Sequence, residues 1–257
     1  MLGIGPSART WCWKAAGKHP AAGDFIDVGQ STPLTDALAE WVNRGYFDLQ
    51  RKGRVSPLPC SWRFWMQGGR KERLICGLVR DSSDHIGRPF PFMIAGEGPW
   101  EGWERRWRDM PAMLAGCWRR LERIASQRYV DLHELSIDVA GLGTPEPENS
   151  ECIQVPMAGP LPASVSGGSE HCRKWGGHFL IALGGSADLD PTQAALKLDR
   201  EMACCGASVP KAGFIGGTSQ HTFLALIMQP LGIDAFEMLW GIQALSRQDH
   251  RGENGVP

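Results

Sequence analysis

Three short apolar segments that follow one another without an intervening helix place the strongest constraint on the fold of this chain. Residues 60–66 and 74–79 flank a turn at residues 67–70, and residues 90–95 follow a second turn. Parallel pairing needs a crossover of about a dozen residues or more between neighbouring strands. Because these connections are shorter, the three segments are expected to pair as antiparallel strands.

Helical periodicity appears on both sides of these strands. Apolar residues recur at helical spacing after Thr32, a predicted N-cap, with Pro33 in the first turn. Residues 100–126 form the longest predicted helix, which Pro111 is expected to kink or break, and a shorter helix is predicted at residues 130–139. The predicted fold class is α/β (α+β), with a central, mostly antiparallel sheet flanked by helices.

The composition changes after residue 140 and suggests a division of the chain. Residues 8–140 are expected to form a core domain, and the Gly- and Pro-rich residues 141–170 a linker or loop. Residues 171–247 are expected to form a carboxy-terminal α/β lobe that packs on the core, and residues 248–257 a flexible tail. Within and before this lobe we predict further strands and helices at residues 10–14 (strand), 178–183 (strand), 191–203 (helix), 212–228 (strand or hairpin) and 234–245 (helix).

Charge and hydropathy argue against several classes of partner. The 257 residues have a formal net charge of -1, which gives no overall field to attract nucleic acid or an anionic membrane. No apolar run approaches the roughly 20 residues of a membrane span, and the amino terminus lacks the pattern of a secretory signal. We therefore expect a cytoplasmic chain that neither binds nucleic acid nor inserts into a membrane, with its eight cysteines as free thiols.

No arrangement of residues in the sequence predicts a catalytic, cofactor or metal site. Gly17 and Lys18 resemble the end of a phosphate-binding loop, but His19 and Pro20 stand where the hydroxyl and the helix start should be. No Gly-x-Ser-x-Gly, Cys-x-x-Cys or His-x-x-x-His spacing occurs. Because catalytic groups assemble in space, a hydrolase-like enzyme remains the alternative, with a serine or with Cys172 and either His171 or His178 in the carboxy-terminal lobe.

Four charged residues lie next to apolar strands or in their turns: Asp24, Arg63, Asp84 and Arg88. An unpaired buried charge is costly, so these residues are expected to lie close together as an ion-pair and turn-capping network. Alternatively, Asp84 and Arg88 are exposed and form a docking spot for a partner. A third hypothesis is a small-molecule sensor that binds an anion at the turn of residues 17–23, beside Lys18 or Arg88.

The same residues carry a resemblance to a known family. The segment from Gly17 to Phe25 resembles a G-K-x-P-x-x-G-D-F element, and the segment from Asp84 to Pro91 resembles a D-x-x-G-R-x-F-P element. Between them, Trp62-Arg63-Phe64 is similar to a W-R-F strand. The order and separation of the three agree with the TagF/ImpM family of type VI secretion system-associated accessory proteins. The matching positions taken as a structural or docking motif are Gly17, Lys18, Pro20, Gly23, Asp24, Phe25, Trp62, Arg63, Asp84, Gly87, Arg88, Phe90 and Pro91.

This resemblance implies a function without catalysis or a cofactor. It implies a cytoplasmic regulator that acts after translation, as a repressor of assembly, through contact with type VI secretion components; a forkhead-associated scaffold protein is the candidate partner. Tryptophan and arginine dominate binding hot spots, so the Trp- and Arg-rich first half of the chain is expected to supply the interface. The sequence predicts neither an oligomeric state nor a role for the cysteines.

Overall fold

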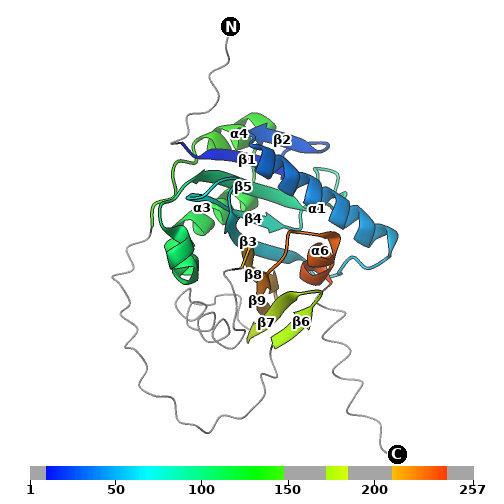
Figure 1. Cartoon of the computed structure of the whole chain (residues 1–257). Coiled ribbons are helices and arrows are strands. Elements are labelled where there is room, and N and C mark those ends of the chain that lie inside the picture. Colours follow the sequence, from blue (N-terminus) through cyan, green and yellow to red (C-terminus); the bar gives the residue numbers. More distant parts are fainter. Residues whose placement is uncertain (1–9, 148–171, 185–209, 242–257) are drawn as a thin grey trace, which may run out of the picture.

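The computed structural model describes residues 10–147, 172–184 and 210–241, which share one nine-stranded sheet (Figure 1). The strand order is β2-β1-β5-β4-β3-β8-β9-β7-β6, and every pairing is antiparallel. The strands are β1 Cys12–Gly17, β2 Ile26–Gly29, β3 Cys60–Gln67, β4 Arg73–Arg80, β5 Phe92–Pro99, β6 Cys172–Trp175, β7 His178–Gly184, β8 Ala212–Thr218 and β9 Thr222–Ile227. The predicted antiparallel sheet and the α+β class are thus confirmed.

The strands predicted from residues 60–95 are β3, β4 and β5, which pair side by side in that order. β5 begins two residues later than expected because Phe90 and Pro91 still belong to the preceding turn. The sequence patterns did not predict β2 and β6. Each is a four-residue strand at an edge of the sheet, IDVG and CRKW, and such short segments carry too little alternation to be recognised.

The carboxy-terminal strands continue the same sheet. β8 pairs with β3 from Cys60↔Thr218 to Met66↔Ala212, and β9 and β7 follow. Other parts of the predicted division fall outside the described residues: most of the linker at 141–170, the helix at 191–203 and the tail at 248–257.

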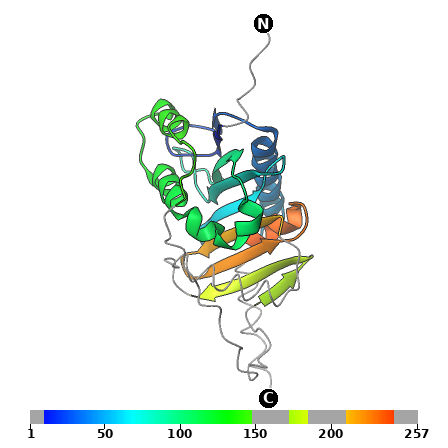
Figure 2. The same cartoon turned by 60° about the vertical axis from the view of Figure 1, so that its left-hand side comes forward.

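One face of the sheet is covered by α1 Pro33–Arg51 and α6 Ile233–Trp240 (Figure 2). α1 begins as predicted: Thr32 is the N-cap, its hydroxyl accepts from the Thr35 amide, and Pro33 follows in the first turn. The two helices touch where Gly45 faces the ring of Phe236; a Cβ at Gly45 would lie 2.3 Å from the Phe236 ring. α1 packs on β1 and β5 and lies beside α6, and the two helices share one apolar core with this face of the sheet.

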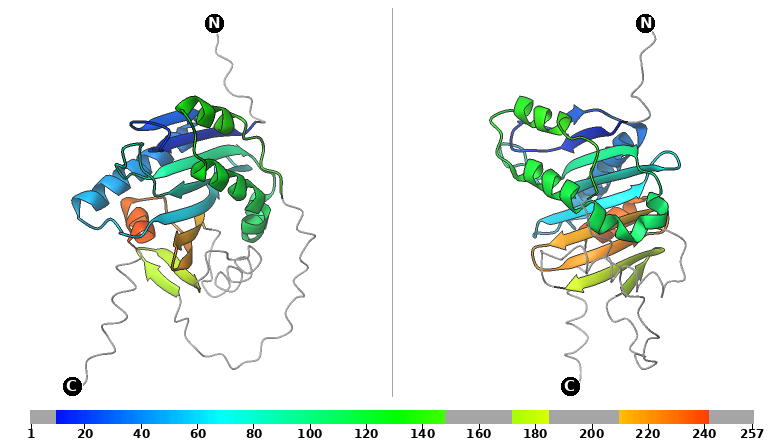
Figure 3. Two further views of the ribbon diagram at one scale, coloured as in Figure 1. Left: turned by 180° about the vertical axis from the view of Figure 1, so that it is seen from behind. Right: turned by 90° about the vertical axis from the view of Figure 1, so that its left-hand side faces the viewer.

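The other face is covered by a helical segment that is broken as Pro111 predicts (Figure 3). The single helix expected at residues 100–126 is divided into η1 Trp103–Asp109, α2 Met110–Met113 and α3 Ala115–Ser126. α4 Leu132–Ala140 follows, with Asp131 as its N-cap. Among the described residues, no helix has both the length and the apolar content that crossing a bilayer would require.

Nine of the eleven tryptophans are buried core residues, including all but Trp100 of those in the first half of the chain, which argues against the expectation that they supply an interface. Trp65 is fully buried and packs on Trp107 and Trp118, with ring centroids 4.9 and 6.0 Å away. On the opposite face, Trp62 and Trp240 are also fully buried. The helices on both faces need large apolar side chains to fill the space above a wide sheet, and burial of these rings supplies much of the hydrophobic stabilisation.

The Thr32 cap gives a test of how α1 is anchored. Replacing Thr32 by alanine removes the acceptor for the Thr35 amide and is expected to lower the free energy of unfolding by about 1 kcal/mol. Thr32→Ser keeps the hydroxyl, so its free energy of unfolding should be close to that of the wild type. Urea unfolding followed by tryptophan fluorescence measures both; equal losses in the two variants would show that the cap is not what stabilises the helix start.

Candidate functional site

The pairing of β1 with β5 brings the two turn motifs together. Gly17, the last residue of β1, lies opposite Phe92, the first residue of β5, so the turns that follow and precede them are neighbours. The Lys18 amide donates to the Pro91 carbonyl across 3.3 Å, and the His85 amide donates to the Ala22 carbonyl across 3.0 Å. Two segments about 70 residues apart in sequence thus form one surface feature.

Asp84 is the centre of this feature and its side chain has no exposed area. Its Oδ2 lies 3.0 Å from Lys18 Nζ and 2.6 Å from Arg88 Nε, and its Oδ1 accepts from the Arg88 amide across 2.9 Å. Burial opposes ionisation of this carboxyl, but the hydrogen bonds from Arg88 and Lys18 outweigh it and hold the pKa far below the ordinary value. Asp84 is therefore a buried anion that fixes both turns.

Arg88 extends the network to the exposed side of the turns. One of its Nη groups donates to the Gly23 carbonyl across 2.6 Å, and the same nitrogen lies 3.9 Å from Asp24 Oδ1. Gly87 precedes it with a φ of 85° in the left-handed region, which glycine adopts without strain. Pro20 and Gly23 are exposed on this turn.

The balance of charge at the turns does not favour an incoming anion. Lys18 and Arg88 each contact the buried Asp84, and Asp24 adds a second carboxylate beside Arg88. A small anion would have to compete with a carboxylate that is already placed and desolvated. The hypothesis of an anion sensor at residues 17–23 is therefore not supported by the geometry.

Arg63 does not belong to the network of Asp24, Asp84 and Arg88 with which it was expected to lie; it pairs with Glu122. Arg63 lies on the face of the sheet that α3 covers, and its Nε contacts Glu122 Oε1 at 2.6 Å. Asp24, Asp84 and Arg88 do come together, with Lys18 as the fourth member. Arg63 was placed wrongly because a helical partner 59 residues away in sequence is invisible to a motif.

Two exposed phenylalanine rings stand beside the charged turns. Phe25 and Phe47 are 49% and 50% exposed, and their ring centroids lie 4.6 and 5.7 Å from the ring of Phe90, which is buried. Lys18 Nζ sits 5.1 Å from the centroid of the Phe25 ring. We call Asp24, Phe25, Phe47 and Arg88 the motif face. Exposed aromatic rings beside charged groups are typical of contact surfaces rather than of catalytic sites.

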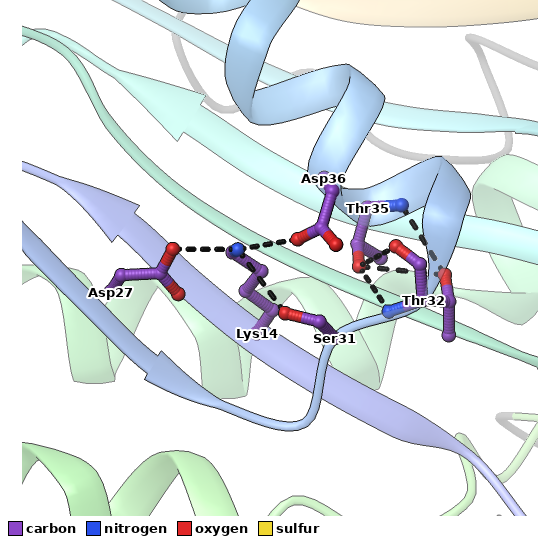
Figure 4. Close-up of polar contacts among 6 residues, drawn as sticks. All are labelled: Lys14, Asp27, Ser31, Thr32, Thr35 and Asp36. Carbon is purple, nitrogen blue, oxygen red and sulfur yellow. Dashed lines mark hydrogen bonds and ion pairs between the residues drawn. The ribbon is translucent and has the colours of Figure 1, made fainter. Parts of the chain in front are cut away.

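A groove of about 760 Å³ runs from the motif face along α1. Its apolar side chains include Ile26, Phe90 and Met93, and its rim carries the carboxylates of Asp27, Asp36 and Glu40. Figure 4 shows Lys14 of β1 pointing into this region, where its Nζ contacts Asp27 at 2.8 Å, Asp36 at 2.6 Å and the Ser31 hydroxyl at 3.2 Å. The groove therefore combines apolar walls with a carboxylate-rich rim.

The charges around Lys14 are strongly coupled. Burial would lower the pKa of Lys14, but its hydrogen bonds to Asp27 and Asp36 outweigh burial and raise the pKa above the ordinary value of 10.5. The same contact lowers the pKa of Asp36. Lys14 thus stays charged and binds the start of α1 to β2. Sequence reasoning missed these residues, although Asp36 in the first helical turn and a lysine within an apolar strand were available signals.

The alternative catalytic arrangement receives no support from the strand register. Cys172 on β6 pairs with Ile181, whereas His178 on β7 pairs with Trp175. Three residues of a strand separate Cys172 from the position opposite His178, about 10 Å at the usual rise. The Nε2 of His178 instead lies 3.3 Å from Asp234 at the start of α6. His171 lies outside the described residues.

Comparison with known proteins relates one segment of the chain to a known domain family. Residues 15–136 match the family model described as the TagF N-terminal domain, type VI secretion system-associated. The crystal structure of PA0076 from Pseudomonas aeruginosa PAO1 at 2.05 Å resolution resembles the chain with 18% sequence identity and a TM-score of 0.49, over 95% of this chain and 96% of that one. Among curated proteins, none matches the chain. All three motifs lie within the matched residues, so the segment from residue 15 to residue 136 is similar to the TagF N-terminal domain of type VI secretion system-associated proteins.

Proposed function

We propose that the chain is a non-enzymatic, cytoplasmic regulator of a type VI secretion system that represses assembly after translation by binding a secretion component. The similarity of residues 15–136 to the TagF N-terminal domain supports an association with the secretion system. Action by contact with a partner is supported by the motif face, where Phe25 and Phe47 are each half exposed beside the ion-paired turns. The motif is thus built to hold aromatic rings at the surface.

The motif face is held rigidly, which favours binding. Asp84 ties both turns to each other, and Phe90 beneath the two exposed rings is itself buried against Tyr46 of α1. A partner that binds here would not have to order the surface first, so less conformational entropy is lost on association. Exposed aromatic rings in such a frame have the character of binding hot spots.

The adjoining groove indicates the chemistry of the partner. Its apolar walls accept an aliphatic or aromatic side chain. The carboxylates at its rim are already paired, Asp27 and Asp36 with Lys14 and Glu40 with Arg44, so they do not select a charged partner. The partner segment should therefore present an apolar residue. A forkhead-associated scaffold protein of the secretion system is the partner that we propose to carry this segment.

Replacement of the exposed aromatic Phe47 tests the proposal. Phe47→Ser is expected to weaken capture of the purified forkhead-associated scaffold protein by about tenfold or more, because it removes a ring at the centre of the contact surface. In a strain that carries the secretion system, the same variant should raise secretion as deletion of the gene does, with unchanged transcript levels of the secretion genes. Quantitative co-precipitation and secretion assays measure the two effects.

A matched control separates contact from folding. Val130 is 88% exposed and lies outside the motif face, so Val130→Ser should leave capture and secretion unchanged. Val130→Ser should melt at the wild-type temperature, and Phe47→Ser should melt somewhat lower, because its ring is half buried against Phe90, but should stay folded under the assay conditions. The proposal fails if Phe47→Ser captures the scaffold protein as well as the wild type does, or if the wild type captures no secretion component and deletion leaves secretion unchanged.

A further inference from the structure

A row of polar residues crosses the sheet on the face that α3 covers. Ser61 on β3 lies opposite Arg80 on β4 and opposite Gly217 on β8, and Gly217 lies opposite Thr222 on β9. Residues directly opposite one another in antiparallel strands project from the same face. Four adjacent strands therefore place a guanidinium, two hydroxyls and a position without a side chain side by side.

The next row on the same face has a different character. Arg63 lies between Leu78 of β4 and Ile215 of β8, and both of these neighbours belong to the apolar core under α3. A charged residue in this position needs a specific partner. Glu122 of α3 provides it, with its Oε1 2.6 Å from Arg63 Nε.

α3 holds the second guanidinium as well. One turn beyond Glu122, the Ser126 hydroxyl accepts from Arg80 Nη1 across 2.7 Å. The two arginines are thus held on one side of a pocket of about 390 Å³, while Thr222 stands on the other side with Gly217. Thr218 also borders the pocket but lies opposite Cys60, whose side chain belongs to the other face of the sheet. We call this the arginine pocket; the polar side chains that line it are Ser61, Arg63, Arg80, Asp81, Glu122, Thr218, Ser219 and Thr222.

The backbone requires glycine where the pocket meets β8. Gly217 has a φ of 141°, and a Cβ there would lie 2.4 Å from the His221 carbonyl oxygen. The neighbouring Gly216 is equally constrained, with a Cβ position 2.0 Å from the Ser61 carbonyl oxygen. Close backbone contacts therefore exclude side chains at both glycines of this segment.

The charges in the pocket favour an anion. Two guanidiniums face one carboxylate, Glu122, and each guanidinium has five N–H donors, more than the contacts with Glu122 and Ser126 engage in the described part of the chain. Asp81 also borders the pocket, but its two oxygens accept from the Cys60 amide and the Trp240 indole, which directs them toward α6 on the opposite face. At the motif turns, by contrast, the buried Asp84 pairs with both cations, Lys18 and Arg88.

We propose that the arginine pocket binds the phosphate group of a small molecule, either free phosphate or a phosphate monoester. Planar guanidiniums bind phosphate oxygens through paired N–H donors, and serine and threonine hydroxyls complete the shell. The volume exceeds that of phosphate itself, so the pocket has room for an attached organic group. The site lies apart from the motif face, on the other side of the sheet, and its existence does not depend on the proposed regulatory function.

Calorimetric titration of the full chain with inorganic phosphate, and separately with glycerol phosphate, tests the proposal. The wild type should bind at least one of the two, and tighter binding of glycerol phosphate would identify a monoester site. Arg80→Gln should weaken binding by about tenfold or more, because it removes a charged hydrogen-bond donor. Glu122→Gln removes the competing carboxylate from Arg63 and should tighten binding by about fivefold.

The Glu122 variant distinguishes a ligand site from a structural ion pair. A purely structural Arg63–Glu122 pair would lose stability in Glu122→Gln without gaining affinity for phosphate. Arg44→Gln serves as the matched control, since it breaks an exposed Arg44–Glu40 pair on α1 and should leave binding unchanged. The proposal is overturned if the folded wild type binds neither ligand, or if Arg80→Gln and Glu122→Gln bind as the wild type does.

Discussion

Replacement of Gly17 by valine is expected to lower the free energy of unfolding by about 3 kcal/mol or more. Gly17 has a φ of 113°, and a Cβ at this position would lie 2.1 Å from the Pro91 carbonyl oxygen. Because the obstacle is backbone rather than a flexible side chain, the strands β1 and β5 would have to separate at their joined ends. Urea unfolding followed by tryptophan fluorescence measures the loss.

A second glycine of the motif provides the control. Gly87 also has a positive φ, 85°, but nothing lies within 4 Å of its Cβ position. Gly87→Ala should therefore cost only the backbone strain, about 1 kcal/mol. If Gly17→Val is no more destabilised than Gly87→Ala, the close approach of Gly17 to Pro91 does not hold the turns together.

The Gly17 contact gives a physical reason for two of the sequence motifs. Gly17, the first residue of one motif, lies against the carbonyl oxygen of Pro91, the last residue of the other, where the ends of β1 and β5 meet. The motif aspartate, Asp84, then joins Lys18 of the first motif to Arg88 of the second. These contacts join the two motifs into one structural unit, although about 60 residues separate them in the sequence.

Local patterns were sufficient to predict most of the fold. The strands from residue 60 to residue 95 and the start of α1 are determined by turn glycines, short connections and a threonine cap, all of which are visible within a few residues. The edge strands β2 and β6 were missed because each has only four residues. Their place in the sheet depends on the neighbouring strand and not on their own sequence.

The candidate site was less accessible to sequence reasoning. Asp24, Asp84 and Arg88 were grouped correctly because they flank turns that the motifs already connect. Arg63 was not, because its partner Glu122 is brought near only by the packing of α3 on the sheet. The tryptophans were assigned to an interface for a similar reason: composition shows how many rings there are but not which face of an element buries them.

Asp84→Asn is expected to be the most destabilising of the polar substitutions in the motif turns. The change leaves the buried Lys18 ammonium without its counter-ion and replaces Oδ2, which accepts from Arg88 Nε, by an amide group that donates. The remaining oxygen can still accept from the Arg88 amide. The double variant Lys18→Met/Asp84→Asn also removes the unpaired lysine charge and should recover part of the lost stability. Urea midpoints of the wild type, both single variants and the double variant measure the coupling; strictly additive losses would show that the two charges do not depend on each other.

The Asp84 carboxylate should make the stability of the protein depend on pH in the acidic range. The pKa of Asp84 in the folded chain lies below the ordinary value of 3.8, so its contribution is complete above that value and is lost as the pH falls further. The wild type should therefore lose stability steeply below about pH 4, whereas Asp84→Asn, which has no proton to gain at this position, should show a shallower decline. Equal slopes in the two proteins would mean that other carboxylates dominate the acid response. A shallower slope in the variant would identify Asp84 as the charge on which the shape of the motif face depends.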